Sequence, residues 1–302
     1  IACKASNLPW SLELSQWVGG LGKELSRKLA SCGLLPVIAS NATIGEFMDE
    51  YIRGRTDVEK STRIALGTFR DRILKFFGES CQMRDVTVGQ ADRFLVHLKS
   101  EYSQATAGRT LKACRQFFRQ ALRDNLIASN PFEGIKPPSE VNKEREAFIT
   151  QGMLQKMLEA CPDRHWRLLI VLARLGGLRC PTEILDLRWE DVNWAAGRMR
   201  VRSKKTKRTG HGQRLVPLFG DLLPHLNEAF EAAEPGEVFV VSRHRGTEVN
   251  LRTQLERIIF RAGLEKWPRL WQNLRSSRET ELTRAGFPIH QVCRWIGNSI
   301  TV

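Results

Sequence analysis

The chain has 302 residues, enough to bury a sizeable core and to form two domains. Its 47 lysines and arginines outnumber its 33 acids by 14, and the pI near 9.9 favours a polyanionic partner, either nucleic acid or an anionic membrane surface. No apolar run approaches the roughly 20 residues that cross a bilayer, and the N-terminus lacks the apolar stretch of a signal peptide, so a membrane partner is the weaker choice.

Cysteine and histidine patterns argue against a disulfide framework and against a metal centre. The seven cysteines are scattered without a CxxC pair, which is typical of reduced thiols in a cytoplasm. The six histidines show no HExxH spacing, and His290 with Cys293 makes at best half a metal site. We therefore expect no metal and no other cofactor.

The N-terminal part of the chain is predicted to be all helical. Residues 1–40 show apolar spacing of three to four, and a second helical unit begins at Asn41. Thr43 and Glu46 have the spacing of a capping box. Further helices are predicted near 59–77, 87–101 and 104–125, and no convincing strand pattern occurs before residue 130.

The predicted helix 104–125 carries a stripe of positive charge. Five bases recur every three or four residues, whereas the other side of the helix is mainly apolar; the bases are Arg109, Lys112, Arg115, Arg119 and Arg123. Only one acid, Asp124, accompanies them. One interpretation is an ordinary solvated face of a packed helix. The other, which the single sign of charge favours, is contact with the DNA backbone or a groove.

A proline-rich segment, residues 130–148, is predicted to link this unit to a second one of mixed structure. The sequence "WRLLIVLARLGG" predicts a buried helix closed by glycines. Alternation over 198–218 predicts a β-hairpin, and "EVFVVS" predicts another short strand. Three later segments are predicted to be helical: 250–263, 273–285 and 288–297. The fold class is therefore multidomain, an all-α unit followed by a mostly helical α+β unit with a small antiparallel sheet.

Three basic features of the second unit suit a phosphate. The hairpin holds eight lysines or arginines between Arg198 and Arg214 without an acid, and a lysine at its tip can serve as a general acid. Arg179 lies in a glycine-flanked turn before a helix predicted to open at Pro181, with Glu183 one turn on to hold its guanidinium. Arg275 and Arg278 are one helical turn apart.

The order of these motifs resembles that of the tyrosine recombinases, the phage-integrase class of site-specific DNA recombinases. A "GLR" turn precedes "EILDLRWEDV", and a lysine hairpin ending in "RLVPL", then "QNLR", then "WIGNS" follow. The resemblance implies an N-terminal segment 1–40, a helical, SAM-like core-binding domain 41–137 and a catalytic domain 138–302. The sequence motifs "GLRCPTE" and "QNLRSSRETEL" are similar to those of integrases from planctomycete-type bacteria.

The resemblance implies roles for individual residues. Arg179 and Arg275 match the two catalytic arginines that bind the scissile phosphate, with Glu183 and Arg278 as supporting residues. Lys205 best matches the general acid that protonates the leaving 5′-oxygen. Lys204 and Lys207 are close rivals for that role. The hairpin is also implied to bind DNA, through Arg202, Lys204, Lys207 and Arg208.

Two positions depart from the family pattern. Gln272 stands where the family usually has the histidine of HxLR, and Asn298 replaces a later histidine or tryptophan. Both amides can donate a hydrogen bond to a phosphate oxygen. Neither can transfer a proton as an imidazole does near neutral pH.

The family's nucleophilic tyrosine lies roughly nine residues after the position of Asn298, so it is expected just beyond Val302. The chain has two tyrosines, Tyr51 and Tyr102, which fall in the other domain and are poor candidates. We therefore expect the chain to end before its nucleophile.

The resemblance implies an enzyme that cleaves and rejoins DNA through a 3′-phosphotyrosyl intermediate and so integrates or excises a mobile element. Double-stranded DNA is the expected partner, with a homotetramer on DNA for the full-length protein, a monomer for this chain, and a cytoplasmic, nucleoid-associated location. Two alternatives stay open. One is a DNA-binding accessory protein that has lost catalysis, which Gln272 and Asn298 favour. The other is type IB topoisomerase-like strand relaxation.

Overall fold

The computed structural model describes residues 42–139, 142–203, 212–246 and 250–298, with a few isolated positions among the first 32. The chain divides into two compact units, Ile1–Val141 and Asn142–Val302, and each is described by itself. The predicted helical segment 1–40 lies almost entirely outside the described residues. The predicted domain boundaries at 40 and 137 stay predictions.

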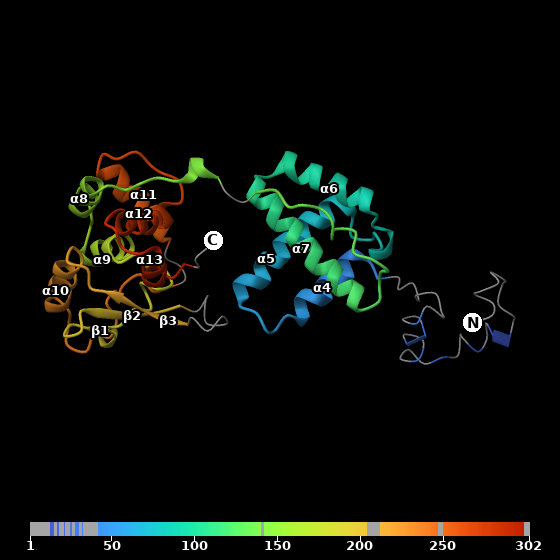
Figure 1. Ribbon diagram of the computed structural model, residues 1–302, viewed down its shortest axis with the longest axis horizontal. Coiled ribbons are helices and arrows are strands. Elements are labelled where there is room, and N and C mark those ends of the chain that lie inside the picture. The colour runs from blue at the N-terminus through green and yellow to red at the C-terminus, as the bar shows by residue number, and fades with distance from the viewer. Residues whose placement is uncertain are drawn as a thin grey trace. The chain divides into compact units, whose positions relative to one another are not determined.

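The described part of the first unit is all helical, as the sequence predicts (Figure 1). Its elements are α4 (Ile44–Gly54), α5 (Lys60–Phe77), the short 3₁₀ helix η1 (Met83–Asp85), α6 (Val88–Glu101) and α7 (Gln104–Arg123). The capping box that opens α4 is present: the Thr43 hydroxyl accepts from the Glu46 amide at 3.2 Å, and the Glu46 carboxylate accepts from the Thr43 amide at 3.4 Å. An ordinary sequence-encoded cap therefore sets where α4 begins.

The core of the first unit forms around the apolar side of α7. Phe117 and Phe118 are fully buried there, and Phe118 packs against Phe132 with ring centroids 4.9 Å apart. Phe94 of α6 belongs to the same cluster. Because the apolar side of α7 faces this core, its basic stripe is left on the outside of the helix.

The described part of the second unit combines helices with a small sheet (Figure 1). Its helices are η2 (Lys143–Arg145), α8 (Gln151–Glu159), α9 (Arg164–Arg174), η3 (Trp189–Asp191), α10 (Leu223–Glu231), α11 (Leu251–Arg261), α12 (Leu270–Arg284) and α13 (Ile289–Ile296). Helix α9 is buried along almost its whole length and packs against α12. The predicted helices near 250–263, 273–285 and 288–297 are confirmed as α11, α12 and α13.

The sheet has three antiparallel strands in the order β1 (Val192–Asn193), β2 (Arg198–Arg202), β3 (Gln213–Pro217), and the predicted hairpin is confirmed as β2 and β3. Met199 pairs with Val192 on one side and with Val216 on the other, and Val201 pairs with Arg214. Met199, Val201 and Val216 are fully buried, whereas the alternate arginines of β2 point away from the core. The hairpin tip, residues 204–211, lies outside the described residues.

Two predicted elements of the second unit are wrong. The sequence "EVFVVS" forms only an isolated bridge between Phe239 and Arg188, because η3 begins one residue later and leaves no extended partner for a longer ladder. No helix opens at Pro181. Residues 180–186 form a series of turns instead, in which the Glu183 side chain bonds back to the Arg179 main chain.

Candidate active site

The turn after α9 places Arg179 and Glu183 against each other. The Arg179 amide donates to Glu183 Oε2 at 2.8 Å, and its guanidinium Nη1 donates to Glu183 Oε1 at 2.5 Å. The backbone N–H of Glu183 donates to the Arg179 carbonyl at 2.9 Å, and this hydrogen bond closes the turn. The contact between these two side chains that the sequence predicts is therefore present, although a turn and not a helix provides it.

Glu183 is the centre of a cluster of three arginines. Its carboxylate also accepts from Arg214 Nη1 and Nη2 at 2.8 and 2.7 Å, and Arg275 Nη1 lies 3.6 Å from it. The side chain of Glu183 is only 1% exposed. Burial opposes its ionisation, but the hydrogen bonds and charges of Arg214 and Arg179 outweigh burial and lower its pKa to about 2. Three guanidinium groups therefore surround one buried carboxylate.

Arg275 reaches this cluster from α12. Its Nη1 donates to the Gly177 carbonyl at 2.9 Å, and its Nη2 donates to Asn298 Oδ1 at 2.9 Å. Burial, together with repulsion from Arg179, lowers the pKa of the Arg275 guanidinium to about 9. A cation held in this way is not fully neutralised by Glu183, so an anion that approaches the cluster is attracted.

Two glycines allow this close packing. Gly177 has φ +65°, and a Cβ there would lie 2.4 Å from Ile296 Cδ1. Gly297 has φ +80° where it caps α13, and a Cβ there would lie 3.1 Å from the Arg214 guanidinium. Both positions therefore need glycine, for conformation and for space.

The two residues that depart from the family pattern differ in their surroundings. Asn298 is exposed and follows the C-terminal cap of α13, where its amide lies between Arg275 and Glu279. Gln272 is exposed on α12, one turn before Arg275. The structure thus brings Asn298 into direct contact with Arg275, and it leaves Gln272 on the surface of the same helix.

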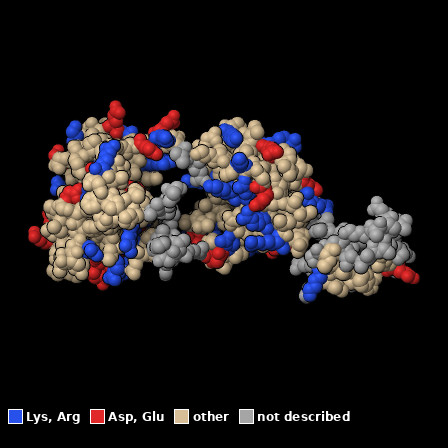
Figure 2. All heavy atoms as spheres, in the orientation of Figure 1, with Lys and Arg blue, Asp and Glu red and all other residues tan. Residues whose placement is uncertain are grey.

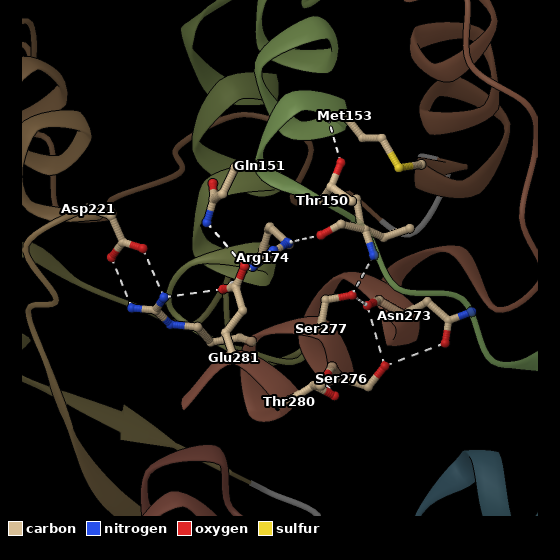
Figure 3. Close-up of polar contacts among 12 residues, drawn as sticks. Thr150, Gln151, Met153, Arg174, Asp221, Asn273, Ser276, Ser277, Thr280 and Glu281 are labelled. Atoms are coloured by element: carbon tan, nitrogen blue, oxygen red, sulfur yellow. Dashed lines mark hydrogen bonds and ion pairs between the residues drawn. The ribbon is translucent and has the colours of Figure 1, made fainter. Parts of the chain in front are cut away.

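Arg278 does not join the Glu183 cluster. Its Nη1 and Nη2 donate to the two carboxylate oxygens of Asp221 at 2.8 and 2.9 Å, and its guanidinium carbon lies 4.2 Å from the centre of the Phe219 ring. The dashed lines at Asp221 in Figure 3 mark these two hydrogen bonds. Arg278 therefore ties α12 to the segment before α10, and its predicted support of the phosphate stays a prediction.

A buried ion pair that the sequence did not indicate fixes α12 to α9. Arg174 is fully buried, and its guanidinium donates to both carboxylate oxygens of Glu281 and, through Nε, to the Ile149 carbonyl at 2.9 Å (Figure 3). Ser277 Oγ accepts from the Ile149 amide at 2.8 Å. Burial opposes ionisation of Glu281, but Arg174 outweighs it and lowers the pKa of the carboxyl group. This network holds the helix that carries Arg275 in place.

The hairpin residues that were assigned to DNA are only partly described. Lys204, Lys205, Lys207 and Arg208 lie outside the described residues, so their predicted roles stay predictions. Arg202 is half-buried and forms an ion pair with Asp191, and Arg200 Nε lies 3.0 Å from the same carboxylate. Arg214, which the sequence showed only as the end of a basic run, is the residue of the hairpin that enters the Glu183 cluster.

The basic stripe of α7 is present on the outside of the first unit. Arg109, Lys112, Arg119 and Arg123 are exposed, and Arg115 is half-buried with its Nε donating to the Phe132 carbonyl at 2.9 Å. Arg119 lies 3.1 Å from Glu133. Figure 2 shows lysine and arginine side chains gathered on the visible face of this unit. Arg115 thus has a structural role besides its place in the stripe.

Comparison with known proteins covers nearly all of the described chain. The Phage integrase family profile matches residues 147–299, and the Phage integrase SAM-like domain profile matches residues 43–140. Tyrosine recombinase XerA of Thermococcus kodakarensis is 28% identical over 225 residues, which are 71% of this chain and 74% of the relative. Tyrosine recombinase XerD of Pseudomonas putida is 26% identical over 249 residues, 75% of this chain and 80% of the relative.

Solved structures show the same fold. A lambda integrase (75–356) dimer bound to a COC′ core site aligns with a TM-score of 0.69 at 18% identity, over 85% of this chain and 96% of that chain. A lambda integrase tetramer bound to a Holliday junction aligns with a TM-score of 0.68 at 18% identity, over 95% of this chain and 84% of that chain. The predicted fold class is confirmed.

The family match and the tyrosine recombinase relatives identify the chain as an enzyme that cuts and rejoins DNA strands. The chain belongs to the phage integrase family, and it is a site-specific recombinase of the tyrosine type. The finer resemblance to planctomycete-type integrases stays a prediction. No helix in the described ranges is long and apolar enough to cross a membrane.

Proposed function

We propose that Arg179 and Arg275 bind the scissile phosphate of DNA. The observation that carries this proposal is that the two arginines, 96 positions apart in the sequence, meet at one buried carboxylate, Glu183. Arg214 completes the cluster, so three positive charges face one negative charge at its centre. The excess suits the negative charge that develops on the non-bridging oxygens of a pentacoordinate phosphorus.

The proposal includes the following cleavage step. A tyrosine hydroxyl attacks the phosphorus and gives up its proton to water, the bond from phosphorus to the 5′-oxygen breaks, and Lys205 gives a proton to that oxygen. A free 5′-hydroxyl of a partner strand then attacks the 3′-phosphotyrosyl bond and releases the tyrosine. The covalent link conserves the energy of the phosphodiester, so no nucleotide is consumed. Tyr51 and Tyr102 pack against the core of the first unit, so neither is assigned the role of this nucleophile.

The first unit supplies a DNA-binding surface in this proposal. Helix α7 carries five bases and no acid, and phosphate contacts made by such a helix position a protein on duplex DNA. In this proposal, residues 41–137 form the core-binding domain and residues 138–302 the catalytic domain, and integration or excision of a mobile element is the biological outcome. The full-length protein assembles as a tetramer on DNA, as the lambda integrase tetramer does on a Holliday junction, and acts at the bacterial nucleoid.

The test of the catalytic proposal is formation of a covalent complex. The full-length protein is incubated with nicked duplex from its host element, and an SDS-resistant protein–DNA adduct is measured. We expect the adduct to disappear in Arg179→Ala and Arg275→Ala. It should persist in the matched control Arg252→Ala, whose side chain is 72% exposed on α11. Binding without any adduct in the unchanged protein would contradict the proposal.

DNA binding by α7 is tested separately. In Arg109→Ala/Lys112→Ala, we expect weaker binding and a salt slope reduced by about 1 for each phosphate that the variant no longer binds. Lys99→Ala, at an exposed base in the last turn of α6, is the matched control. An unchanged salt slope in the α7 variant would remove this helix from the DNA interface.

A further inference from the structure

Glu279 lies in contact with the residue that replaces the family's histidine. It follows Arg275 by four positions on α12, so the two side chains share one face of that helix. The Asn298 amide lies between them: its Oδ1 accepts from Arg275 Nη2 at 2.9 Å, and its Nδ2 donates to Glu279 Oε2 at 2.8 Å. The three side chains therefore form one chain of hydrogen bonds at the edge of the Glu183 cluster.

The chemistry of the two neighbours allows one orientation of the Asn298 amide. A guanidinium can only donate hydrogen bonds, and an ionised carboxylate can only accept them. The amide oxygen must therefore face Arg275, and the amide nitrogen must face Glu279. With the amide reversed, both contacts would bring like groups together, so Arg275 and Glu279 select the same orientation and Glu279 holds the far end of the amide in it.

We propose that Glu279 is a positioning residue of the active site, which holds the Asn298 amide so that its oxygen fixes Arg275 for the scissile phosphate. This inference rests on the proposed function of Arg275. Asn298 then acts mainly through Arg275. In the family, by contrast, the histidine or tryptophan at this position has an N–H donor. The arrangement also explains how Arg275 keeps its place, since its other contacts are the Gly177 carbonyl and the shared carboxylate of Glu183.

The backbone supports the same arrangement. Gly297, with φ +80°, turns the chain at the end of α13, and the backbone N–H of Asn298 then donates to the Cys293 carbonyl at 3.0 Å. Asn298 is exposed, whereas Arg275 is buried. Asn298 is thus held through its backbone by the helix cap and through its side chain by two charged groups, next to the surface that DNA would approach.

The experiment measures the single-turnover rate of adduct formation at saturating protein, together with the DNA dissociation constant. Glu279→Ala is expected to slow cleavage by about 10- to 100-fold, the size typical when an outer partner of a functional group is removed, with DNA affinity unchanged. Glu279→Gln keeps an acceptor for Asn298 and should stay within about threefold of the unchanged protein. Glu228→Gln, an exposed carboxylate on α10, is the matched control.

A reversed pair gives the sharpest test. Asn298→Asp places a second carboxylate beside Glu279 and should slow cleavage at least as much as Glu279→Ala. In Asn298→Asp/Glu279→Gln, the glutamine amide can donate to one oxygen of the new carboxylate, and the other oxygen still accepts from Arg275. We therefore expect at least about tenfold recovery over Asn298→Asp alone. A purely structural defect at either position would not be recovered in this way.

The outcomes separate the two proposals. If the unchanged protein forms an Arg179-dependent adduct and Glu279→Ala cleaves at the same rate, the proposed function stands and the role of Glu279 is wrong. If the reversed pair is no faster than Asn298→Asp alone, the oxygen of residue 298 does not act through Arg275, and the inference is overturned. If the unchanged protein forms no adduct, both proposals fail.

Discussion

Glu183 offers a quantitative test of the arginine cluster. Its pKa is lowered from 4.5 to about 2 in the folded chain, and a difference of this size corresponds to about 3 kcal/mol of stability. Because the folded state binds the proton less tightly than the unfolded state, this contribution is complete above about pH 4.5. It is lost as the pH falls through about 2. At pH 3, about 2 kcal/mol of it should already be gone.

The perturbation is Glu183→Gln, and the assay is urea unfolding followed by tryptophan fluorescence between pH 7 and pH 3. Six of the eight tryptophans lie between residues 166 and 295, so the signal reports mainly the second unit. We expect the difference in unfolding free energy between the unchanged protein and Glu183→Gln to shrink by about 2 kcal/mol over this range. Glu228→Gln serves as the matched control for general charge effects. A difference that stays constant with pH would refute the claim that Glu183 is a buried, arginine-bound carboxylate.

Three further predictions concern stability. Glu281→Ala leaves the fully buried Arg174 without its carboxylate and should lower the unfolding free energy of the second unit by about 3–5 kcal/mol, measured by urea unfolding. Gly177→Ala should destabilise more than Gly197→Ala in thermal unfolding, since both have positive φ but only the first has a side chain within 4 Å; equal losses would contradict this. Arg115→Ala should lower the stability of the first unit by about 1 kcal/mol, measured by circular dichroism, because its Nε bonds a main-chain carbonyl.

Local spacing made part of the structure predictable. The capping box at Thr43 and the contact between Arg179 and Glu183 each join residues three or four apart, so the sequence contains the whole interaction. The apolar periods of α7 and of the hairpin likewise predicted which faces are buried. Such patterns predict whether each of these segments is a helix or a strand, because the spacing of apolar residues lies within the segment itself.

Other contacts depend on the tertiary fold and leave no local signal. Arg214 meets Glu183 across 31 positions, and Asn298 meets Glu279 across 19 positions, so neither partner could be chosen from spacing. The segment "EVFVVS" has the composition of a strand, but its formation needs a neighbouring strand that the fold does not supply. Arg278 was grouped with Arg275 because they are one turn apart, yet Asp221, distant in sequence, binds it instead.

The central claim is that Arg179 and Arg275 bind one phosphate. A crystal structure of the full-length protein bound to its DNA site tests it most directly. We predict that both guanidinium groups lie within hydrogen-bonding distance of the non-bridging oxygens of the same phosphate, with Glu183 still between them and Arg214. Arg179 and Arg275 on different phosphates, or facing away from DNA that is otherwise bound, would contradict the claim.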